Sequence, residues 1–314
     1  MTSSGGAGDL SSIDAFGLLT NDTRIDILLA LWRRRGPQTF SELQENAGVE
    51  DPGNFNYHLE QLRGTFLLER DEGYDLTRAG RRALTAIFAE DITALPTIER
   101  TQVDRQCPFC GSSVELVAHE DDLRIRCPTC PGSFEVTTRS RRRDTPHPSG
   151  TISVVSLPTG GVRDRSPNDL CDVGTAWTLA RATTYLKGIC PDCSGEISTS
   201  PIICSDHESD GICTHCGTRF LGRLDVECGT CLNGMVFNLS VIARLDATAV
   251  AYFDDHGYDL LDPGFEDATV LIACDERLHS TDPLDYEANW TLDGETLRVR
   301  CDDRFHVTES TRHS

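Results

Sequence analysis

Six closely spaced pairs of metal-ligating residue types constrain this chain of 314 residues more than any other feature. Five have the form CxxC and one the form CxxH, and they begin at Cys107, Cys127, Cys190, Cys204, Cys213 and Cys228. Each such turn points two ligand atoms into one small volume, so two turns together offer four ligands to a tetrahedral ion. A chain of this length can build a core without cross-links, so the cysteines need another explanation.

Whether paired cysteines form metal sites or disulfides depends on the redox state of the cellular compartment. The first 20 residues lack a basic start followed by an apolar run. No window approaches the roughly 18 consecutive apolar residues of a membrane span. We therefore expect a cytoplasmic protein with no membrane contact, where paired cysteines indicate metal or redox chemistry rather than structural disulfides. Six pairs followed by strand-like or Gly-rich turns favour metal over a thioredoxin-like dithiol, which needs one pair at a helix start.

The first two pairs predict one zinc ribbon. Alternating, strand-like segments separate Cys107 and Cys110 from Cys127 and Cys130, and a hairpin would bring the second turn opposite the first. Four sulfurs about 2.3 Å from a zinc ion fit this arrangement. Iron in a rubredoxin-like site is the rival, because four thiolates suit it as well.

The remaining four pairs offer eight ligands for two further ions. The spacing favours consecutive ribbons, the first of which uses Cys190, Cys193, Cys204 and His207. The second then uses Cys213, Cys216, Cys228 and Cys231. A crossed arrangement, in which alternate pairs share a metal, uses the same eight ligands and stays open.

These ligand sets predict about three structural zinc ions per chain. They also lead us to expect that the protein is not an enzyme. A catalytic zinc keeps an open coordination position and a nearby carboxylate base, whereas each proposed set here has four protein ligands. We expect the metals to stabilise segments whose apolar content is too small for a core.

The first 90 residues show helical patterns with capping residues. A helix after Asn21 and Asp22 would bury the stripe Ile25, Leu28, Leu29 and Trp32. The TFSE stretch from Thr39 fits a capping box, and the short helix it opens should end at Gly48. Asp51 and Pro52 then begin a third helix with the apolar stripe Phe55, Leu59 and Leu62.

A two-stranded wing, LLER and YDLT, and a closing helix follow. The segments FGLLTNDTRIDILLAL, FNYHLEQLRGTFLLER and GYDLTRAGRRAL resemble the winged helix-turn-helix of ArsR-type transcription regulators. Metal sensors of that family carry cysteines on the winged helix, whereas this chain has none before Cys107. Direct metal sensing by this region is therefore not expected.

The resemblance implies sequence-specific binding to double-stranded DNA by one helix in the major groove. The candidate base readers are Asn54, Asn56, Tyr57, His58 and Gln61. The candidate phosphate contacts are Arg63, Arg70, Arg78, Arg81 and Arg82. Many winged regulators form homodimers through their first and last helices. The apolar residues Ile13, Phe16, Leu18, Leu84, Ile87 and Phe88 permit a dimer or, alternatively, a packed monomer core.

The net charge differs between the first 90 residues and the rest of the chain. The whole chain has a formal charge of −21, and Lys187 is its only lysine among 29 basic residues. Residues 1–90 hold 9 basic and 14 acidic residues and are the least acidic part. An acidic, lysine-poor surface resembles proteins of halophilic archaea, where molar salt shortens the Debye length to about 3 Å.

The rest of the chain completes a prediction of an α+β multidomain fold. Four arginines, Arg139 and Arg141 to Arg143, form a basic cluster that either contacts DNA or a partner or is a solvated loop. The Asp293-Gly294 turn predicts a hairpin, and ATVLIAC and FHV predict further strands. The predicted domains are a winged helix-turn-helix over 11–90, a linker over 91–106, a first zinc ribbon over 107–138, a basic and Pro/Gly loop over 139–165, a connecting helix over 166–188, a double zinc-ribbon region over 190–235 and a C-terminal α+β module over 236–314.

A transcription-machinery adaptor is the alternative function. A winged helix followed by a zinc ribbon also describes archaeal transcription initiation factor E, which acts on RNA polymerase. An adaptor facing the polymerase does not need the polar helix face around Asn54 to Gln61. That face therefore favours the DNA-binding regulator.

Overall fold

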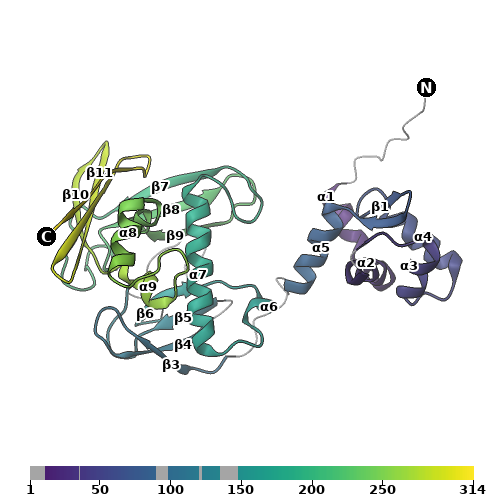
Figure 1. Cartoon of the computed structure of the whole chain (residues 1–314), viewed down its shortest axis with the longest axis horizontal. Helices are drawn as coiled ribbons and strands as arrows, with labels where there is room; N and C mark the ends of the chain where they lie inside the picture. The colour runs from purple at the N-terminus through teal and green to yellow at the C-terminus, as the bar shows by residue number, and fades with distance from the viewer. Residues whose placement is uncertain (1–10, 35, 90–97, 120–121, 135–147) are drawn as a thin grey trace. The chain divides into compact units, whose positions relative to one another are not determined.

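The structure is a computed structural model of mixed α/β type with several small sheets (Figure 1). It describes residues 11–34, 36–89, 98–119, 122–134 and 148–314. The chain divides into two compact units, Met1–Ala94 with Pro158–Gly160 and Leu95–Leu157 with Gly161–Ser314. Within the described residues, no helix combines the length and the apolar character needed to cross a bilayer.

The first unit contains four helices, a hairpin and a closing helix. The elements are α1 (Ser12–Leu18), α2 (Asp22–Arg34), α3 (Phe40–Asn46), α4 (Pro52–Leu62), β1 (Leu67–Arg70), β2 (Gly73–Leu76) and α5 (Arg78–Ala89). The predicted caps are confirmed. Asn21 Oδ1 accepts the Arg24 N–H at 3.2 Å, Thr39 and Glu42 form a capping box, and Asp51 accepts the Gly53 N–H.

Helix α2 is the central element of this unit, because it packs against α3, α4, α5 and β2. Neighbours on several sides bury more than one stripe, so the predicted single stripe is only partly right. The fully buried residues are Ile27, Leu28, Ala30 and Leu31. Trp32 is 36 % exposed and stacks on Phe88 of α5 with the ring centroids 5.7 Å apart.

The second unit holds three antiparallel sheets. The first consists of β3 (Thr101–Gln106), β4 (Ser113–His119), β5 (Asp122–Arg126) and β6 (Thr151–Val155) in that order. The second consists of β7 (Ile197–Ile203), β8 (Gly222–Cys228) and β9 (Gly234–Asn238). The third consists of β10 (Asp275–Thr281), β11 (Leu284–Leu292), β12 (Glu295–Cys301) and β13 (Val307–His313).

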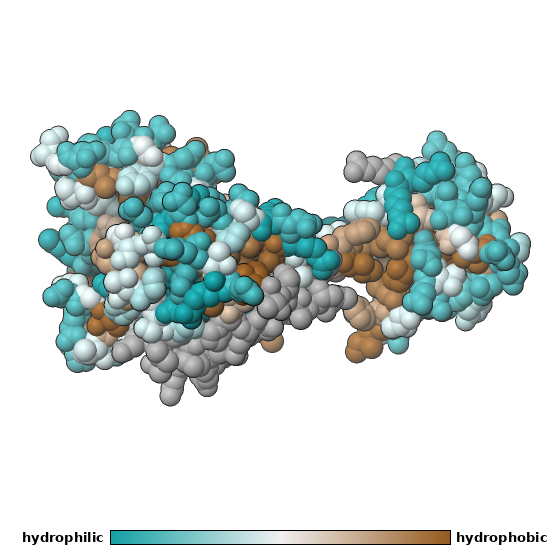
Figure 2. All heavy atoms as spheres, turned by 90° about the horizontal axis from the view of Figure 1, so that it is seen from below, coloured by the Kyte–Doolittle hydropathy of each residue, from teal (hydrophilic) through white to brown (hydrophobic). Residues whose placement is uncertain are grey.

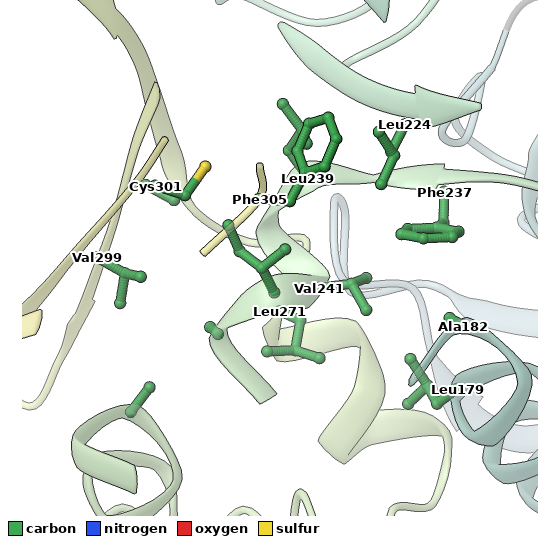
Figure 3. Close-up of a cluster of buried hydrophobic side chains, with 14 of the residues drawn as sticks. Leu179, Ala182, Leu224, Phe237, Leu239, Val241, Leu271, Val299, Cys301 and Phe305 are labelled. Carbon is green, nitrogen blue, oxygen red and sulfur yellow. The ribbon is translucent and has the colours of Figure 1, made fainter. Parts of the chain in front are cut away.

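Helix α7 (Pro167–Leu186) joins two cores of this unit. Its first half buries Leu170 and Cys171 against the β3–β6 sheet. Its second half buries Leu179 and Ala182 in the core that contains the other two sheets, where Figure 3 shows them near Val241 and Phe237. Ser166 and Asp169 form a capping box at its start, as the sequence predicts for a helix over 166–188. The predicted connecting helix is therefore a core element.

An ion pair fixes α7 to the first sheet. Asp172 accepts hydrogen bonds from Arg105 of β3 through both carboxylate oxygens, at 3.2 and 2.5 Å. It also accepts the Phe265 N–H at 3.0 Å, at the start of α9 (Phe265–Val270). These contacts hold the pKa of the Asp172 carboxyl below its usual value despite burial, which opposes them. One carboxylate thus links a strand and two helices.

The remaining elements correct several predictions. The region 91–106 ends in β3 rather than being linker throughout, and β6 lies within the predicted loop over 139–165. ATVLIAC is not a strand, because its first residues belong to α9, at whose start the Gly264 N–H donates to Asp267. The predicted hairpin at Asp293-Gly294 is confirmed between β11 and β12, and helix α8 (Ala247–Asp255) forms, with α9, the α-helical part of the C-terminal region. The arginines of the basic cluster lie outside the described residues.

Gly150 lets the chain pass close to the CxxC turn that begins at Cys127. It has a φ of +88°, and a Cβ added there would lie 2.1 Å from the Cys127 carbonyl oxygen. Gly188 has a similar φ of +76°, but no atom lies within 4 Å of an added Cβ. Substitutions at the two positions therefore distinguish the effect of steric overlap from the effect of backbone strain.

We expect Gly150→Ala to lower the free energy of unfolding of the second unit by about 3 kcal/mol, because overlap adds to the strain of positive φ. Gly188→Ala should cost only about 1 kcal/mol, from strain alone. Denaturant unfolding of both variants measures the difference. Equal costs would contradict the close approach at Gly150.

Candidate metal centres

Among the residues that the structure describes, three groups of four side chains in the second unit could each hold a metal ion. All candidate ligand atoms within a group lie within 4.8 Å of one another. Cluster 1 is Cys107, Cys110, Cys127 and Cys130. Cluster 2 is Cys190, Cys193, Cys228 and Cys231. Cluster 3 is Cys204, His207, Cys213 and Cys216.

Cluster 1 forms as its spacing predicts. The turn at Cys107 follows β3, and the β4–β5 hairpin brings the turn at Cys127 back beside it. The Cys107 and Cys130 sulfurs are 3.6 Å apart, and the Cys110 and Cys127 sulfurs 3.5 Å. Tetrahedral zinc with bonds of about 2.3 Å places its sulfurs about 3.8 Å apart. Disulfide sulfurs are about 2 Å apart, so these are free thiols with the spacing of metal ligands.

The other two clusters are nested rather than consecutive or crossed, which corrects the predicted pairing. Strand β7 separates the turn at Cys193 from Cys204 by about 20 Å of extended chain. Antiparallel β8 then returns, and its register places Cys228 opposite Ile197 and Gly222 opposite Ile203. The outer pairs therefore meet at one end of the β7–β8 hairpin. The inner pairs meet in the loop at its other end.

Backbone N–H groups donate hydrogen bonds to two sulfurs of cluster 2. The Gly195 N–H donates to Cys193 Sγ and the Thr230 N–H to Cys228 Sγ, each at 3.4 Å. The backbone N–H of Cys231, with that of Thr230, lowers the pKa of the Cys228 thiol to about 6 although burial opposes this. The pKa values of the Cys193 and Cys231 thiols are raised by the neighbouring cysteines. Thiolate is the metal-binding form, so Cys228 is the sulfur of this cluster that its turn prepares for an ion.

Cluster 3 differs in its histidine. His207 Nδ1 lies 3.5 Å from Cys216 Sγ, and its Nε2 lies 3.3 Å from the Arg219 carbonyl oxygen. An Nε2–H that donates to this carbonyl leaves Nδ1 free as a ligand. Burial lowers the pKa of His207 and so favours the neutral imidazole that a metal needs. Sets of four cysteines, or of three cysteines and one histidine, are typical of structural zinc.

Supporting side chains outside the CxxC pattern were missed by sequence reasoning. Arg181 of α7 donates to both oxygens of Asp192, at 2.7 and 2.8 Å, and Asp192 lies between the two cysteines of a cluster 2 turn. Arg219 contacts the turns of two clusters. Neither arginine has a sequence signal, because each contact joins segments that only the tertiary fold brings together.

In the first unit, α4 presents a polar face to solvent. Asn54, Asn56, Tyr57 and Gln61 are exposed, and Tyr57 is 56 % exposed. His58 corrects the predicted set, because it is buried beside Leu59 on the opposite side and Arg24 Nε donates to its Nδ1 at 3.4 Å. Four of the five predicted base readers thus share the exposed face of one helix.

The predicted phosphate contacts are exposed arginines, several of them in ion pairs. Arg63 pairs with Glu60 and with Glu69. Asp75 lies 3.7 Å from Arg70 and 3.1 Å from Arg81. Arg78 and Arg82 are exposed on α5. Both partners of each Arg63 pair are exposed, so another anion can replace either glutamate at little cost.

Helices α1 and α5 leave large apolar side chains uncovered. Ile13 is 84 % exposed, Phe16 67 % and Phe88 48 %. Leu84 is fully buried in the core of the unit, while Leu18 and Ile87 pack partly against it. Figure 2 shows apolar surface gathered over part of this unit. The predicted set therefore divides into monomer core and exposed apolar surface.

Two family matches account for most of the chain. Residues 104–307 match a family described as a domain of unknown function, DUF7351. Residues 12–87 match a second such family, DUF7347. No curated protein and no solved structure matches the chain.

The nested pairing can be tested with Cys193→Ser, which removes one ligand from cluster 2. We expect the bound metal to fall by one ion per chain and Cys228 and Cys231 to become reactive towards maleimide, while Cys204 stays protected. Metal analysis and peptide mass spectrometry measure both effects. Cys171→Ser, at a buried cysteine outside the clusters, is the control and should keep all the metal. Reactive Cys204 with protected Cys228 would indicate consecutive pairing.

Proposed function

We propose that this chain, which belongs to the DUF7351 family, is a sequence-specific DNA-binding transcription regulator with structural zinc sites. Its first unit is a winged helix-turn-helix in this proposal, with α4 as the recognition helix and the β1–β2 hairpin as the wing. The observation that carries the proposal is the exposed polar face of α4.

The chemistry of that face suits base edges. Amide groups such as those of Asn54 and Gln61 pair with two atoms of adenine in the major groove, and Tyr57 adds a hydroxyl and an aromatic surface. The core residues Phe55, Leu59 and Leu62 hold the helix from its other side. A helix that is fixed in this way presents its polar side chains at defined spacings.

The zinc ions have a structural role in the proposal. Each cluster supplies four protein ligands, which leaves no coordination position for a substrate. Zinc with four thiolates carries a charge of about −2, so the acidic second unit repels phosphate. DNA binding is therefore assigned to the first unit, and the metal-containing unit is available for protein contacts.

A test of base recognition compares Asn54→Ala and Gln61→Ala with Thr85→Ala, an exposed control on α5. We expect each α4 change to weaken binding to the preferred sequence by about 1–3 kcal/mol, because a two-atom base contact is lost. Thr85→Ala should bind as the parent does. Binding isotherms at one fixed potassium chloride concentration measure this, because salt alone changes the affinity.

Equal weakening on every DNA sequence would contradict base recognition. The footprint of the tagged protein across the genome then distinguishes the adaptor that resembles archaeal initiation factor E. Scattered, operator-like sites support the regulator. Occupancy at most promoters would support a partner on RNA polymerase instead.

The exposed apolar residues of α1 and α5 support a homodimer. We expect Phe88→Glu and Ile13→Glu to convert dimer to monomer, because each places a charge in a buried interface. Light scattering coupled to size exclusion measures the mass. Glu45→Gln, at an exposed site on α3, should leave the dimer intact. A parent protein that is already monomeric at micromolar concentration would refute this part of the proposal.

A further inference from the structure

Clusters 1 and 3 belong to segments about 90 residues apart in the sequence, yet they are joined by a continuous set of contacts. Phe134 and Thr218 form an antiparallel bridge, and the Arg219 N–H donates to the Ser133 carbonyl oxygen at 3.1 Å. Ser133 and Thr218 are completely buried. The loop that carries cluster 3 is therefore packed against the turn that follows Cys130.

Arg219 contacts both clusters through different parts of one residue. Its carbonyl oxygen lies 3.3 Å from Nε2 of His207, a cluster 3 ligand. Its side-chain Nε donates to the Gly132 carbonyl oxygen at 2.7 Å, two residues after Cys130. Its guanidinium lies over the ring of Phe109, between Cys107 and Cys110, with 4.4 Å to the ring centroid. Both turns of cluster 1 thus touch one side chain.

An ion bound at cluster 3 would hold His207, whose Nε2 faces the Arg219 carbonyl oxygen, and would thereby order the Arg219 backbone. An ordered backbone there places the guanidinium between Gly132 and Phe109. Ordering by one ligand lowers the cost of binding a second, which is positive coupling between two sites.

We infer that Arg219 is a positioning residue that couples metal binding at clusters 1 and 3, so that each ion raises the affinity of the other. The inference rests on the metal content proposed above and does not depend on DNA binding. Cluster 2 lies at the other end of the β7–β8 hairpin, and its own arginine, Arg181, contacts Asp192 instead. Cluster 2 therefore provides an internal reference.

The experiment uses the full-length protein loaded with zinc and challenged with a chelator. Maleimide labelling mapped by peptide mass spectrometry reports each cluster separately, because a cysteine reacts once its ion has left. In the parent protein, cysteines of clusters 1 and 3 should become reactive together. Cys213→Ser, which disables cluster 3, should speed labelling of Cys110 and Cys127 by about fivefold or more.

Removal of the Arg219 side chain should abolish the coupling between clusters 1 and 3. In Arg219→Ala, cluster 1 should be labelled equally fast with and without Cys213→Ser, and Arg219→Lys should restore part of the coupling through its charge over Phe109. Arg181→Ala is the matched control and should keep the coupling between clusters 1 and 3. In Arg219→Ala, the rate at cluster 2 should be that of the parent.

Three results would overturn the inference. The first is unchanged labelling of cluster 1 in Cys213→Ser, and the second is an equal effect of Cys213→Ser with and without Arg219. If Cys213→Ser does not fold, the labelling rates of Arg219→Ala are compared with those of the parent. The third result is then that the ions of clusters 1 and 3 leave together in both proteins. A protein that purifies without metal would instead refute the zinc proposal itself.

Discussion

The antiparallel register of β7 and β8 is the constraint on which the arrangement of clusters 2 and 3 depends. It places Cys228 opposite Ile197, beside the turn of Cys193, and Gly222 opposite Ile203, beside Cys204. The ends of one hairpin thus become two separate ligand sets. A shift of one residue would turn every side chain of the shifted strand to the other face and move Cys228 away from its partners. The ligand sets and the strand pairing therefore specify the same arrangement.

This dependence explains what the sequence reveals about the metal centres. A CxxC turn is local, so the spacing alone identifies all twelve side chains that the structure gathers into clusters. Which turns share an ion depends on strand register, and register is set by packing along the whole hairpin. Short intervals between turns favour consecutive ribbons, but the seven residues of β7 are extended and hold their ends apart. Cluster 1 was predictable because its hairpin directly joins its own two turns.

The first unit shows the same limit for individual side chains. Its caps at Asn21, Thr39 and Asp51 are local and were predictable. The burial of His58 was not, because it depends on the packing of α4 against α2, from which Arg24 donates to the His58 ring. Helical periodicity identifies a face of α4 but does not determine how wide the buried arc is. Arg219 carries no pattern at all, because its partners come from another sheet.

Arginine also has an electrostatic role in the acidic second unit. Zinc bound at these clusters would add about −2 or −1 each to a chain already at −21. Arg181, Arg219 and Arg223 lie close to the clusters. Burial lowers the pKa of Arg223, and the neighbouring sulfurs of Cys216 and Cys204 oppose that effect. A guanidinium stays protonated where burial would neutralise an ammonium, and its planar donors fit carbonyl and carboxylate groups. A chain with one lysine thus keeps its half-buried cations in the charged form that can hold the loops of the clusters together, even where salt screens the surface.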